Sequence, residues 1–288
     1  MEHSSVSIII PAKNEALSIG HIVAQLKDKF CEVIVVDDGS SDGTAAIAMS
    51  EGAQVISHPY SKGNGASIKT GARAASGETL VFMDGDGQHN PNDISNLLAK
   101  LECGYDMVVG ARSASSQASV GRLAANFFYN RFGSWMVGHR IDDLTSGFRV
   151  VRADKFREFI HLLPNGFSYP TTSTMAFFRA GYSVCYEPII AAKREGKSHI
   201  NVVKDGVRFL LIIFKVGTLY SPLKLFTPIS MGVFSLGLFR YLYTYMVSGN
   251  FTNMSALLFS TSLLIFLIGL VSEQITMLIY QNNTGHEK

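Results

Sequence analysis

Short apolar runs alternate with stretches of helical pattern up to about residue 190. The runs are rich in β-branched residues, and between them apolar residues recur at helical spacing. Strands that are buried on both faces and separated by helices form a mostly parallel sheet. The pattern therefore predicts an α/β fold with a mostly parallel sheet and flanking helices. The predicted strands are 6–12, 32–38, 53–59, 78–84 and 106–112.

Polar side chains follow four of these runs, at the point where each predicted strand ends. Ligands of parallel α/β sheets bind beyond the carboxyl ends of the strands. We therefore expect one convergent site at this edge of the sheet. The groups that would reach it are Lys13 to Glu15, Asp37 and Asp38, Asp84 to Gln88, and Arg112.

Two long apolar stretches, 225–247 and 255–280, follow towards the end of the chain. Each is longer than the about 20 residues that a helix needs to cross a bilayer. A short polar loop joins them, and Tyr241, Tyr243 and Tyr245 cluster near one end, as aromatic residues do at a membrane surface. The stretches predict a transmembrane hairpin. The alternative, a pair of buried helices in a soluble protein, fits poorly with their length and low charge.

Two charged residues lie inside these stretches. Arg240 is near the loop end and Glu273 near the opposite end, so they lie at different depths in an antiparallel hairpin. We expect Arg240 to extend to the membrane surface and Glu273 to face another helix or another subunit. A homo-oligomer formed through these helices is therefore left open.

The segment between the two parts reads KDGVRFLLIIFKVGTLYSP. On a helix, Lys204, Arg208 and Lys215 fall within about 40° of one another, away from the apolar side chains. This arrangement predicts a helix lying in the membrane surface, and an ordinary amphipathic helix packed on the domain is the alternative. The predicted parts are an α/β domain over 1–200, an interfacial helix region over 201–222, and the hairpin with a short tail over 223–288.

Composition narrows the classes of partner. Lys and Arg number 25 against 23 Asp and Glu, so the net charge of +2 gives no reason to expect electrostatic binding to nucleic acid. The 3 cysteines show no C-x-x-C spacing, and the first residues lack the pattern of a signal peptide. These features favour an α/β domain in the cytosol. With the predicted hairpin we expect a multi-pass membrane protein, and the expected membrane is that of a bacterial or archaeal cell.

The sequence MDGDGQHNP places side-chain oxygen donors close together at a strand end. Asp84, Asp86 and Gln88 offer the closely spaced oxygens that suit a hard divalent cation such as Mg²⁺ or Mn²⁺. A calcium EF-hand is excluded because His89 occupies the position of the required glycine and Ser95 that of the final glutamate. Zinc is disfavoured because no cysteine or second histidine stands near His89 at ligand spacing.

Two further motifs, VVDDGSSDGT and SKGNGASIKTG, reach the same predicted edge. Asp37 and Asp38 in the first could accept hydrogen bonds from a nucleobase or ribose, although helix capping accounts for part of this motif. Lys62, Gly63 and Gly65 in the second open a predicted helix, whose exposed amides and positive end suit phosphate oxygens. The second motif is neither a P-loop nor a dinucleotide fingerprint.

Taken in order, IIIPAKNE, VVDDGSSDGT, KGNGASIKTG and MDGDGQHNP resemble the motifs of family-2 glycosyltransferases with a GT-A nucleotide-sugar fold. Further along, DDLTSGFRV (142–150) and KREGKSHI (193–200) resemble elements of the dolichol-phosphate-mannose synthase and polyprenyl-phosphate glycosyltransferase branch. The resemblance implies a membrane-anchored, metal-dependent, inverting enzyme. It would move a sugar from a nucleotide-sugar donor to a polyprenyl phosphate, either undecaprenyl or dolichyl.

The resemblance also implies roles for individual residues. Those expected to bind the donor are Pro11, Lys13, Glu15, Val36, Asp38, Lys62, Asp84, Gly85, Asp86 and Arg194. Those expected to hold Mg²⁺ or Mn²⁺ are Asp84, Asp86 and Gln88. Those expected to meet the acceptor phosphate are Arg112, Arg122, Asn126, Ser198 and His199. The expected catalytic residues are Asp86, Arg112 and Arg122.

The segment KREGKSH departs from the R-x-x-G-x-S-K pattern of the mannose synthases. Either Lys193 or Arg194 could take the arginine role, and His199 replaces a lysine. An acceptor monophosphate, with a second pKa of about 6, is already ionised enough to attack without a general base. Asp142 and Asp143 could serve as a base or as supports for a loop near the acceptor.

Two other functions remain open from the sequence. One is a transferase that acts on another lipid or on a saccharide, and the other is an inactive membrane module that binds nucleotide sugar. The intact cluster over 84–88 argues against the inactive module, because a binding relic has little need for a complete metal site. The identity of the sugar does not follow from the sequence.

Overall fold

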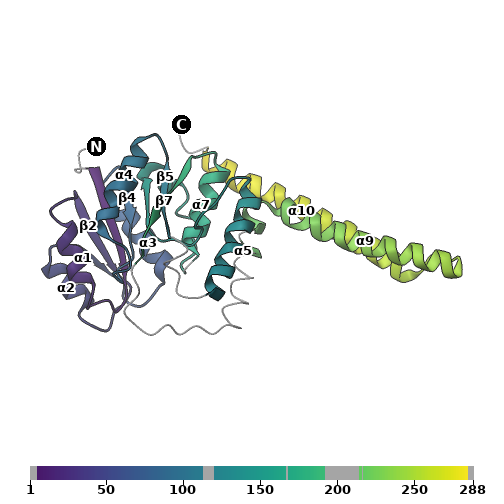
Figure 1. Ribbon diagram of the computed structural model, residues 1–288, viewed down its shortest axis with the longest axis horizontal. Helices are drawn as coiled ribbons and strands as arrows, with labels where there is room; N and C mark the ends of the chain where they lie inside the picture. The colour runs from purple at the N-terminus through teal and green to yellow at the C-terminus, as the bar shows by residue number, and fades with distance from the viewer. Residues whose placement is uncertain (1–4, 113–119, 167, 192–213, 216, 285–288) are drawn as a thin grey trace. The chain divides into compact units, whose positions relative to one another are not determined.

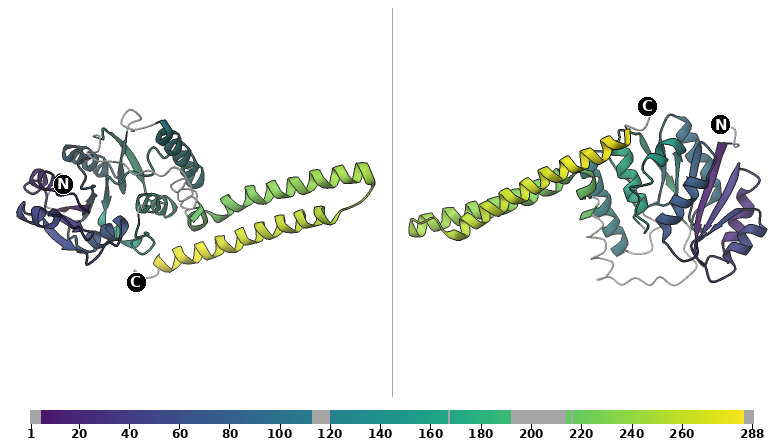
Figure 2. Two further views of the ribbon diagram at one scale, coloured as in Figure 1. Left: turned by 90° about the horizontal axis from the view of Figure 1, so that it is seen from below. Right: turned by 180° about the vertical axis from the view of Figure 1, so that it is seen from behind.

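The computed structural model describes residues 5–112, 120–166, 168–191, 214–215 and 217–284, and the side chains of these residues except 120–125 and 279–284. The chain divides into two compact units, Met1–Ile200 and Asn201–Lys288. Each unit is described by itself below. Figures 1 and 2 show the sheet and its flanking helices in the first unit and a long helical hairpin in the second.

The first unit is built on a 7-stranded sheet with the order β3-β2-β1-β4-β6-β5-β7. Its strands are β1 (Val6–Ala12), β2 (Glu32–Asp37), β3 (Gln54–Ser57), β4 (Thr79–Phe82), β5 (Met107–Arg112), β6 (Arg149–Arg152) and β7 (Val184–Ile189). All neighbouring strands are parallel except that β6 is antiparallel to both β4 and β5. The prediction of a mostly parallel sheet is confirmed, and β6 and β7 extend the five predicted strands.

Helices cover both faces of the sheet. They are α1 (Ile19–Leu26), α2 (Thr44–Ser50), α3 (Asn64–Ala74), α4 (Ile94–Glu102), α5 (Val120–Val137), α6 (Ala153–Glu158) and α7 (Tyr169–Arg179). Successive side chains of a strand point to opposite faces. Ile8 and Ile10 of β1 therefore join the core cluster that holds Leu26 of α1 and Leu97 of α4. Ile9 points to the other face, where Gly71 lets α3 approach: a Cβ there would lie 2.4 Å from Ile9 Cγ2.

The antiparallel direction of β6 matters for the site. Arg149, the first residue of β6, pairs with Phe82, the last residue of β4. The segment that precedes β6 therefore arrives at the edge where the parallel strands end. As a result, residues 142–148 join the loops that follow β1, β2 and β4.

The second unit contains two antiparallel helices, α9 (Pro222–Ser248) and α10 (Asn253–Thr284). Pro222–Ser248 has a mean hydropathy of 1.3 and Asn253–Leu278 one of 2.3, and both segments are long enough to cross a membrane. Many of their large apolar side chains are exposed. The predicted hairpin of two apolar helices is confirmed.

Polar groups inside the hairpin bind one another. The Ser230 and Ser262 hydroxyls each donate to the backbone carbonyl of the other residue at 2.9 Å. The Leu223 amide, in the first turn of α9, donates to Glu273 Oε2 of α10 at 3.3 Å. Glu273 thus faces another helix, which is one of its two predicted positions. It accepts from an amide in the first turn of α9, and the amides of a first helical turn have no partner within their own helix.

The predicted interfacial helix lies mostly outside the described residues. Within it, residues 214–215 and 217–220 are helical. The boundaries 1–200, 201–222 and 223–288 as functional parts stay a prediction.

Candidate functional site

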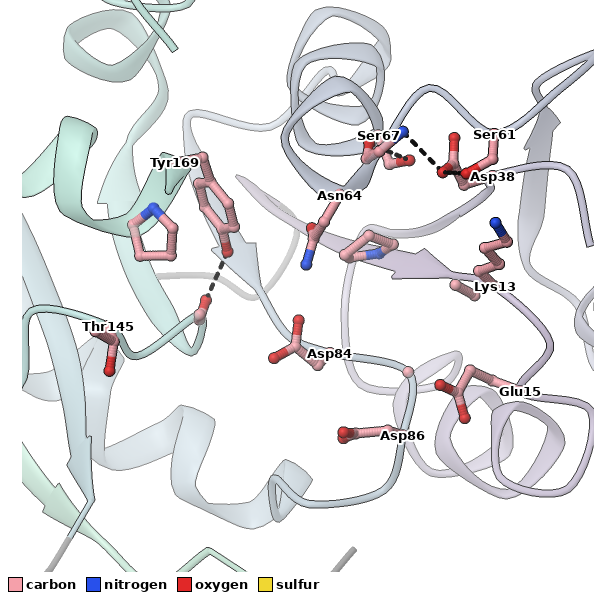
Figure 3. Close-up of a pocket in the computed structure, with 16 residues that line it drawn as sticks. Lys13, Glu15, Asp38, Ser61, Asn64, Ser67, Asp84, Asp86, Thr145 and Tyr169 are labelled. Carbon is pink, nitrogen blue, oxygen red and sulfur yellow. Dashed lines mark hydrogen bonds between the residues drawn. The ribbon is translucent and has the colours of Figure 1, made fainter. Parts of the chain in front are cut away.

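A cavity of about 500 Å³ opens at the edge of the sheet where β1, β2 and β4 end (Figure 3). Its lining residues are Pro11, Ala12, Lys13, Glu15, Asp38, Ser61, Gly63, Asn64, Ser67, Asp84, Gly85, Asp86, Thr145, Gly147, Tyr169 and Pro170. They come from the ends of three parallel strands, the loop before α3, the start of α3, the segment before β6, and the first turn of α7. The cavity lies at the edge where the sequence predicts a convergent site. Lys13, Glu15, Asp38, Asp84 and Asp86 line it, whereas Asp37, Gln88 and Arg112 do not.

The loop after β1 is held in place by the loop after β2. Asn14 has a φ of 57°, which Asn tolerates better than most residues. Its amide donates to Ser40 Oγ at 2.9 Å, and its Oδ1 accepts from the Ser41 amide at 2.8 Å. The Glu15 amide donates to Thr44 Oγ1 at 2.9 Å. The motif DGSSDGT thus fixes the loop that carries the cavity residues Lys13 and Glu15.

The Asp38 carboxylate organises the next loop. His58 Nδ1 lies 2.8 Å from Asp38 Oδ1, which also accepts from the Lys62 amide at 2.7 Å. Asp38 Oδ2 accepts from Ser61 Oγ at 2.7 Å and from the Gly63 amide at 2.9 Å. Burial alone would raise the pKa of this carboxyl, but the bonds from His58, Ser61 and the two amides lower it to about 2. Contact of Asp38 with a nucleoside stays a prediction, and its described bonds support residues 58–63.

The start of α3 is packed against a distant loop. The Gly65 amide donates to the Gly166 carbonyl at 3.2 Å, and the Ala66 amide to the Asn165 carbonyl at 3.1 Å. A Cβ on Gly65 would lie 2.1 Å from the Pro164 carbonyl oxygen, so only glycine allows this approach. The prediction of exposed amides at this helix end is wrong for these two, because loop carbonyls already accept from them.

Asp84 and Asp86 add two carboxylates to the cavity, besides those of Glu15 and Asp38. Both carboxylates lie in it, at the end of β4 (Figure 3). Asp86 Oδ1 accepts from the Gln88 amide at 3.1 Å, which shapes the turn after the strand. Gln88 is half-buried but does not line the cavity.

His89, which the sequence left without a role, has a structural one. Its ring stacks on Phe148 with centroids 4.9 Å apart, and its Nδ1 lies 3.4 Å from the Asp84 amide, which donates to it. The residue therefore ties the end of β4 to the segment that leads into β6.

Arg112 lies at the end of β5 and is held by two residues of the segment before β6. Its Nε and Nη2 donate to Asp143 at 2.8 and 3.0 Å, and Nη2 also donates to Thr145 Oγ1 at 2.6 Å. Burial disfavours the charged guanidinium, but Asp143 and the nearby charge of Asp84 outweigh it, so the pKa of Arg112 is raised. Asp143 thus acts as a loop support, one of its two predicted roles.

A fully buried arginine lies beneath the cavity. Arg149 donates to the Pro170 carbonyl at 3.0 Å, to Ser173 Oγ at 2.7 Å and to the Ser146 carbonyl. Its guanidinium carbon lies 5.7 Å from the centroid of the Tyr169 ring. Burial lowers the pKa of this guanidinium. Arg149 joins the segment before β6 to the first turn of α7, so both cavity walls depend on it.

Most predicted donor residues lie together in the cavity: Pro11, Lys13, Glu15, Asp38, Asp84, Gly85 and Asp86. Other predicted residues do not line it. Val36 is fully buried in β2, Lys62 contributes its amide to Asp38, and Asn126 is half-buried in α5. The side chain of Arg122 and all of Lys193, Arg194, Ser198 and His199 lie outside the described residues.

Several cavity residues were not predicted from the sequence: Ser61, Asn64, Ser67, Thr145, Gly147, Tyr169 and Pro170. Ser61, Asn64, Ser67, Thr145 and Gly147 belong to motifs that were identified, so their position in the motif was an available signal. The Oδ1 atom of Asn64 is buried and has no hydrogen-bond partner among the described residues. Buried polar atoms are nearly always hydrogen-bonded, and a ligand in the cavity would give this one a partner.

Solved structures share this architecture. Glucosyl-3-phosphoglycerate synthase from Mycobacterium tuberculosis, crystallised with Mn²⁺, UDP-glucose and phosphoglyceric acid, is similar with a TM-score of 0.61 and 20% identity. The match covers 75% of this chain and 81% of that one. At this identity the likeness establishes the fold.

Curated relatives extend the comparison. Glycosyltransferase AglJ of Haloferax volcanii is 28% identical over 83% of this chain and 80% of its own. Polyprenol monophosphomannose synthase of Mycolicibacterium smegmatis is 30% identical over 65% of this chain and 77% of its own.

Two family models match separate parts of the chain. The model described as the GtrB C-terminal hairpin matches residues 221–278, which are α9 and most of α10. Together with the length and hydropathy of these helices, this match indicates membrane association. The model described as glycosyl transferase family 2 matches residues 7–160, a range that includes most of the cavity. The chain therefore belongs to glycosyl transferase family 2.

Proposed function

We propose that this chain is a membrane-anchored, inverting glycosyltransferase that moves a sugar from a nucleotide-sugar donor to a polyprenyl phosphate. The observation that carries the proposal is that one chain holds both an acidic family-2 cavity and, over its residues 221–278, a hairpin that matches the GtrB C-terminal hairpin model. The relative from Mycolicibacterium smegmatis, named for a polyprenol monophosphate product, supports the choice of acceptor.

A divalent cation fits the donor set of the cavity. Asp84 and Asp86 supply two carboxylates, and no cluster of three or more His, Cys, Asp or Glu side chains occurs among the described residues. Mg²⁺ is commonly held by one or two carboxylates together with substrate phosphates and water. Asp84 and Asp86 would hold the ion, with Gln88 following on the same turn. When bound, Mg²⁺ or Mn²⁺ would supply charge stabilisation for the departing nucleoside diphosphate.

The chain's own residues then have distinct tasks. Pro11, Lys13 and Glu15 would contact the nucleoside, and the buried Asn64 acceptor could receive a donor group of the ligand. Arg112, together with Arg122, would neutralise the acceptor phosphate. Of the five N–H donors of a guanidinium, the bonds of Arg112 to Asp143 and Thr145 use three, which leaves capacity for a phosphate oxygen. Bringing two anions together and orienting them is the main catalytic requirement.

The membrane arrangement is also part of the proposal. Both α9 and α10 would span a bacterial or archaeal cell membrane, with residues 1–200 on the cytosolic side and residues 201–222 in the membrane surface. Nucleotide sugars and the phosphate of the lipid would then meet on the same side of the bilayer.

Transfer of radiolabelled sugar into an organic-extractable polyprenyl-phosphate product tests the proposal. Membranes that contain the full chain are incubated with a panel of nucleotide sugars, and the product is identified by mass. We expect transfer that chelation abolishes and that added Mg²⁺ or Mn²⁺ restores. Asp86→Asn should lower the rate by at least about 100-fold, as loss of a leaving-group stabiliser does. Asp28→Asn, at an exposed carboxylate outside the cavity, should retain the parent rate.

Other outcomes would replace the proposal. Transfer to a different lipid or to a saccharide would remove the polyprenyl phosphate assignment but keep the enzyme class. Nucleotide-sugar binding without transfer to any acceptor would leave an inactive binding module. Full activity after complete chelation would remove the metal from the proposed mechanism.

A further inference from the structure

The cavity has two ends, which different parts of the chain supply. The loops after β1 and β2 form one end, and the segment before β6 with the first turn of α7 forms the other. The carboxylates of Asp84 and Asp86 lie between Lys13 at the first end and Tyr169 at the second (Figure 3). In the proposed function these carboxylates hold the diphosphate through a metal ion and Lys13 meets the nucleoside, so the sugar lies toward Tyr169.

The end of the cavity at Tyr169 also adjoins the arginine proposed for the acceptor. Thr145 lines this end, and its Oγ1 accepts from Arg112 Nη2 at 2.6 Å. A sugar in transfer lies between the departing diphosphate and the phosphate oxygen that attacks it. The space between Asp84 and Thr145 has this position, because Asp84 belongs to the proposed diphosphate site and Thr145 contacts the proposed acceptor arginine.

The Tyr169 hydroxyl is a hydrogen-bond acceptor at this end of the cavity. Tyr169 is 1% exposed, and its hydroxyl donates to the Gly147 carbonyl at 3.1 Å. A Cβ on Gly147 would lie 3.3 Å from Tyr169 Oη and 3.0 Å from Asp84 Oδ2, so the hydroxyl and the carboxylate flank the same glycine. Since the hydroxyl proton is already used, only the oxygen lone pairs remain for a ligand.

Asn64 adds a second acceptor. It is the first residue of α3 and lines the cavity, and its carboxamide is directed towards Asp84 in Figure 3. Its Oδ1 is buried and has no hydrogen-bond partner in the described part of the chain. A buried acceptor without a partner costs free energy, which a hydroxyl or N–H group of a bound ligand would recover.

We propose that Asn64 and Tyr169 select the sugar of the donor by accepting hydrogen bonds from its hydroxyl or amide N–H groups. The ligand class is a nucleotide sugar with an unsubstituted hydroxyl or an acetamido N–H at the positions that face these residues. A site built to bond such a group rejects analogues that lack it, because its own polar atoms are then left unpaired. The inference rests on the proposed function and adds to it the residues that choose the sugar.

Comparing ligands with and without a sugar tests the proposal. The full chain in detergent micelles with Mn²⁺ is titrated calorimetrically with UDP and UDP-glucose and with GDP and GDP-mannose, and the tighter pair is used for the variants. Asn64→Ala and Tyr169→Phe should each weaken binding of the nucleotide sugar by about 3- to 10-fold and that of the nucleoside diphosphate by less than about twofold. Retained diphosphate binding shows that the variants are folded. Equal weakening of both ligands, or of neither, would overturn the proposal.

Lys13→Gln is the matched control at the other end of the cavity. It should weaken the nucleotide sugar and the nucleoside diphosphate by the same factor, so the ratio of their dissociation constants stays at the parent value. A ratio that changes in Lys13→Gln as much as in Asn64→Ala would overturn the assignment of Asn64 to the sugar.

Monodeoxy analogues of the bound nucleotide sugar identify the hydroxyl that Asn64 accepts from. Removing that hydroxyl should weaken binding to the parent by about 3- to 10-fold and cause no further loss in Asn64→Ala. If every analogue loses the same factor in both proteins, the proposal fails. Sugar transfer to polyprenyl phosphate is measured on the same preparations. Transfer without these binding differences would remove this inference alone, whereas the binding differences without transfer would remove the proposed function alone.

Discussion

Asp143 holds the guanidinium of Arg112 through two parallel hydrogen bonds, from Nε at 2.8 Å and from Nη2 at 3.0 Å. The Asp143 side chain is almost fully buried, whereas that of Arg112 is 30% exposed. Burial would raise the pKa of the Asp143 carboxyl, but its bonds with Arg112 lower it. Both partners are therefore charged near neutral pH, and the arginine is held in one orientation at the end of β5.

The first prediction concerns this ion pair. Asp143→Asn should lower turnover with a polyprenyl-phosphate acceptor by up to about 100-fold, because a displaced Arg112 no longer orients the phosphate. The Asp143 carboxylate accepts hydrogen bonds from the Arg112 guanidinium. In the asparagine variant, one of these oxygens is replaced by an amide N–H, which cannot accept them. The Michaelis constant for the acceptor should rise more than that for the nucleotide sugar, since only the acceptor is expected to meet Arg112.

Asp142 provides the matched control. It pairs with Arg140, whose side chain is 88% exposed, and exposed pairs contribute about 0–1 kcal/mol. Asp142→Asn should therefore change both Michaelis constants by less than about twofold. An Asp143→Asn enzyme with parent kinetics would show that the orientation of Arg112 is irrelevant to acceptor binding.

The second prediction concerns the packing of α3 on the loop at 164–166. Gly65→Ala should destabilise the first unit by about 1–3 kcal/mol, because a Cβ would lie 2.1 Å from the Pro164 carbonyl oxygen. Gly166 lies in the same contact, but a Cβ on it would meet nothing within 4 Å. Gly166→Ala should therefore stay within about 0.5 kcal/mol of the parent.

Urea unfolding followed by Trp135 emission measures both variants, since the 1 tryptophan of the chain lies in the first unit. Equal stability of Gly65→Ala and Gly166→Ala would mean that this loop moves away from α3 at little cost.

The sequence predicted the structure best where one local pattern determines a strand or the turn that follows it. The five predicted strands are all present because β-branched runs between helical patterns have few other stable arrangements. The acidic turn at Asp84 to Asp86 was placed correctly at the sheet edge for the same reason. By contrast, β6 contains only Arg149–Arg152, and its two arginines gave no strand signal.

Contacts between distant segments explain what the sequence did not predict. The amides of Gly65 and Ala66 looked available for phosphate, but residues 165 and 166 accept from them, about 100 positions along the chain. Similarly, the Asp38 carboxylate accepts hydrogen bonds from residues 58–63, and the motif that contains Ser61 to Gly63 gave no sign of this contact. Tyr169 enters the cavity through α7, a helix without any motif that points to ligand binding.

The third prediction concerns acid stability. Folding lowers the pKa of Asp38 from 3.8 to about 2. The ionised carboxylate therefore stabilises the folded chain at any pH above the pKa of the unfolded chain. This contribution is lost as the pH falls from about 4 to about 2. The full contribution is about 2 kcal/mol at 1.36 kcal/mol per pKa unit. The stability difference between the parent and Asp38→Asn should therefore shrink by about this amount on acidification.

Urea midpoints at a series of pH values, again followed by Trp135 emission, measure this difference. Asp28→Asn, at an exposed carboxylate, serves as the control and should run parallel to the parent over the whole range. A constant gap between the parent and Asp38→Asn from pH 5 to pH 2 would contradict the assigned role of the His58, Ser61 and amide bonds.

The fourth prediction concerns the hairpin. A Cβ on Gly269 would lie 2.7 Å from Phe226 Cβ, so Gly269→Ala should push α9 and α10 apart. The Ser230 and Ser262 hydroxyl oxygens are 3.1 Å apart, and cysteines at these two positions would report on the separation. In a chain whose native cysteines are replaced by serine, oxidation should join the pair rapidly, and Gly269→Ala should slow this step. Gly232→Ala, where a Cβ meets nothing within 4 Å, should leave the rate unchanged. Equal rates in the two variants would mean that lipid, rather than contact between α9 and α10, sets the spacing of the helices.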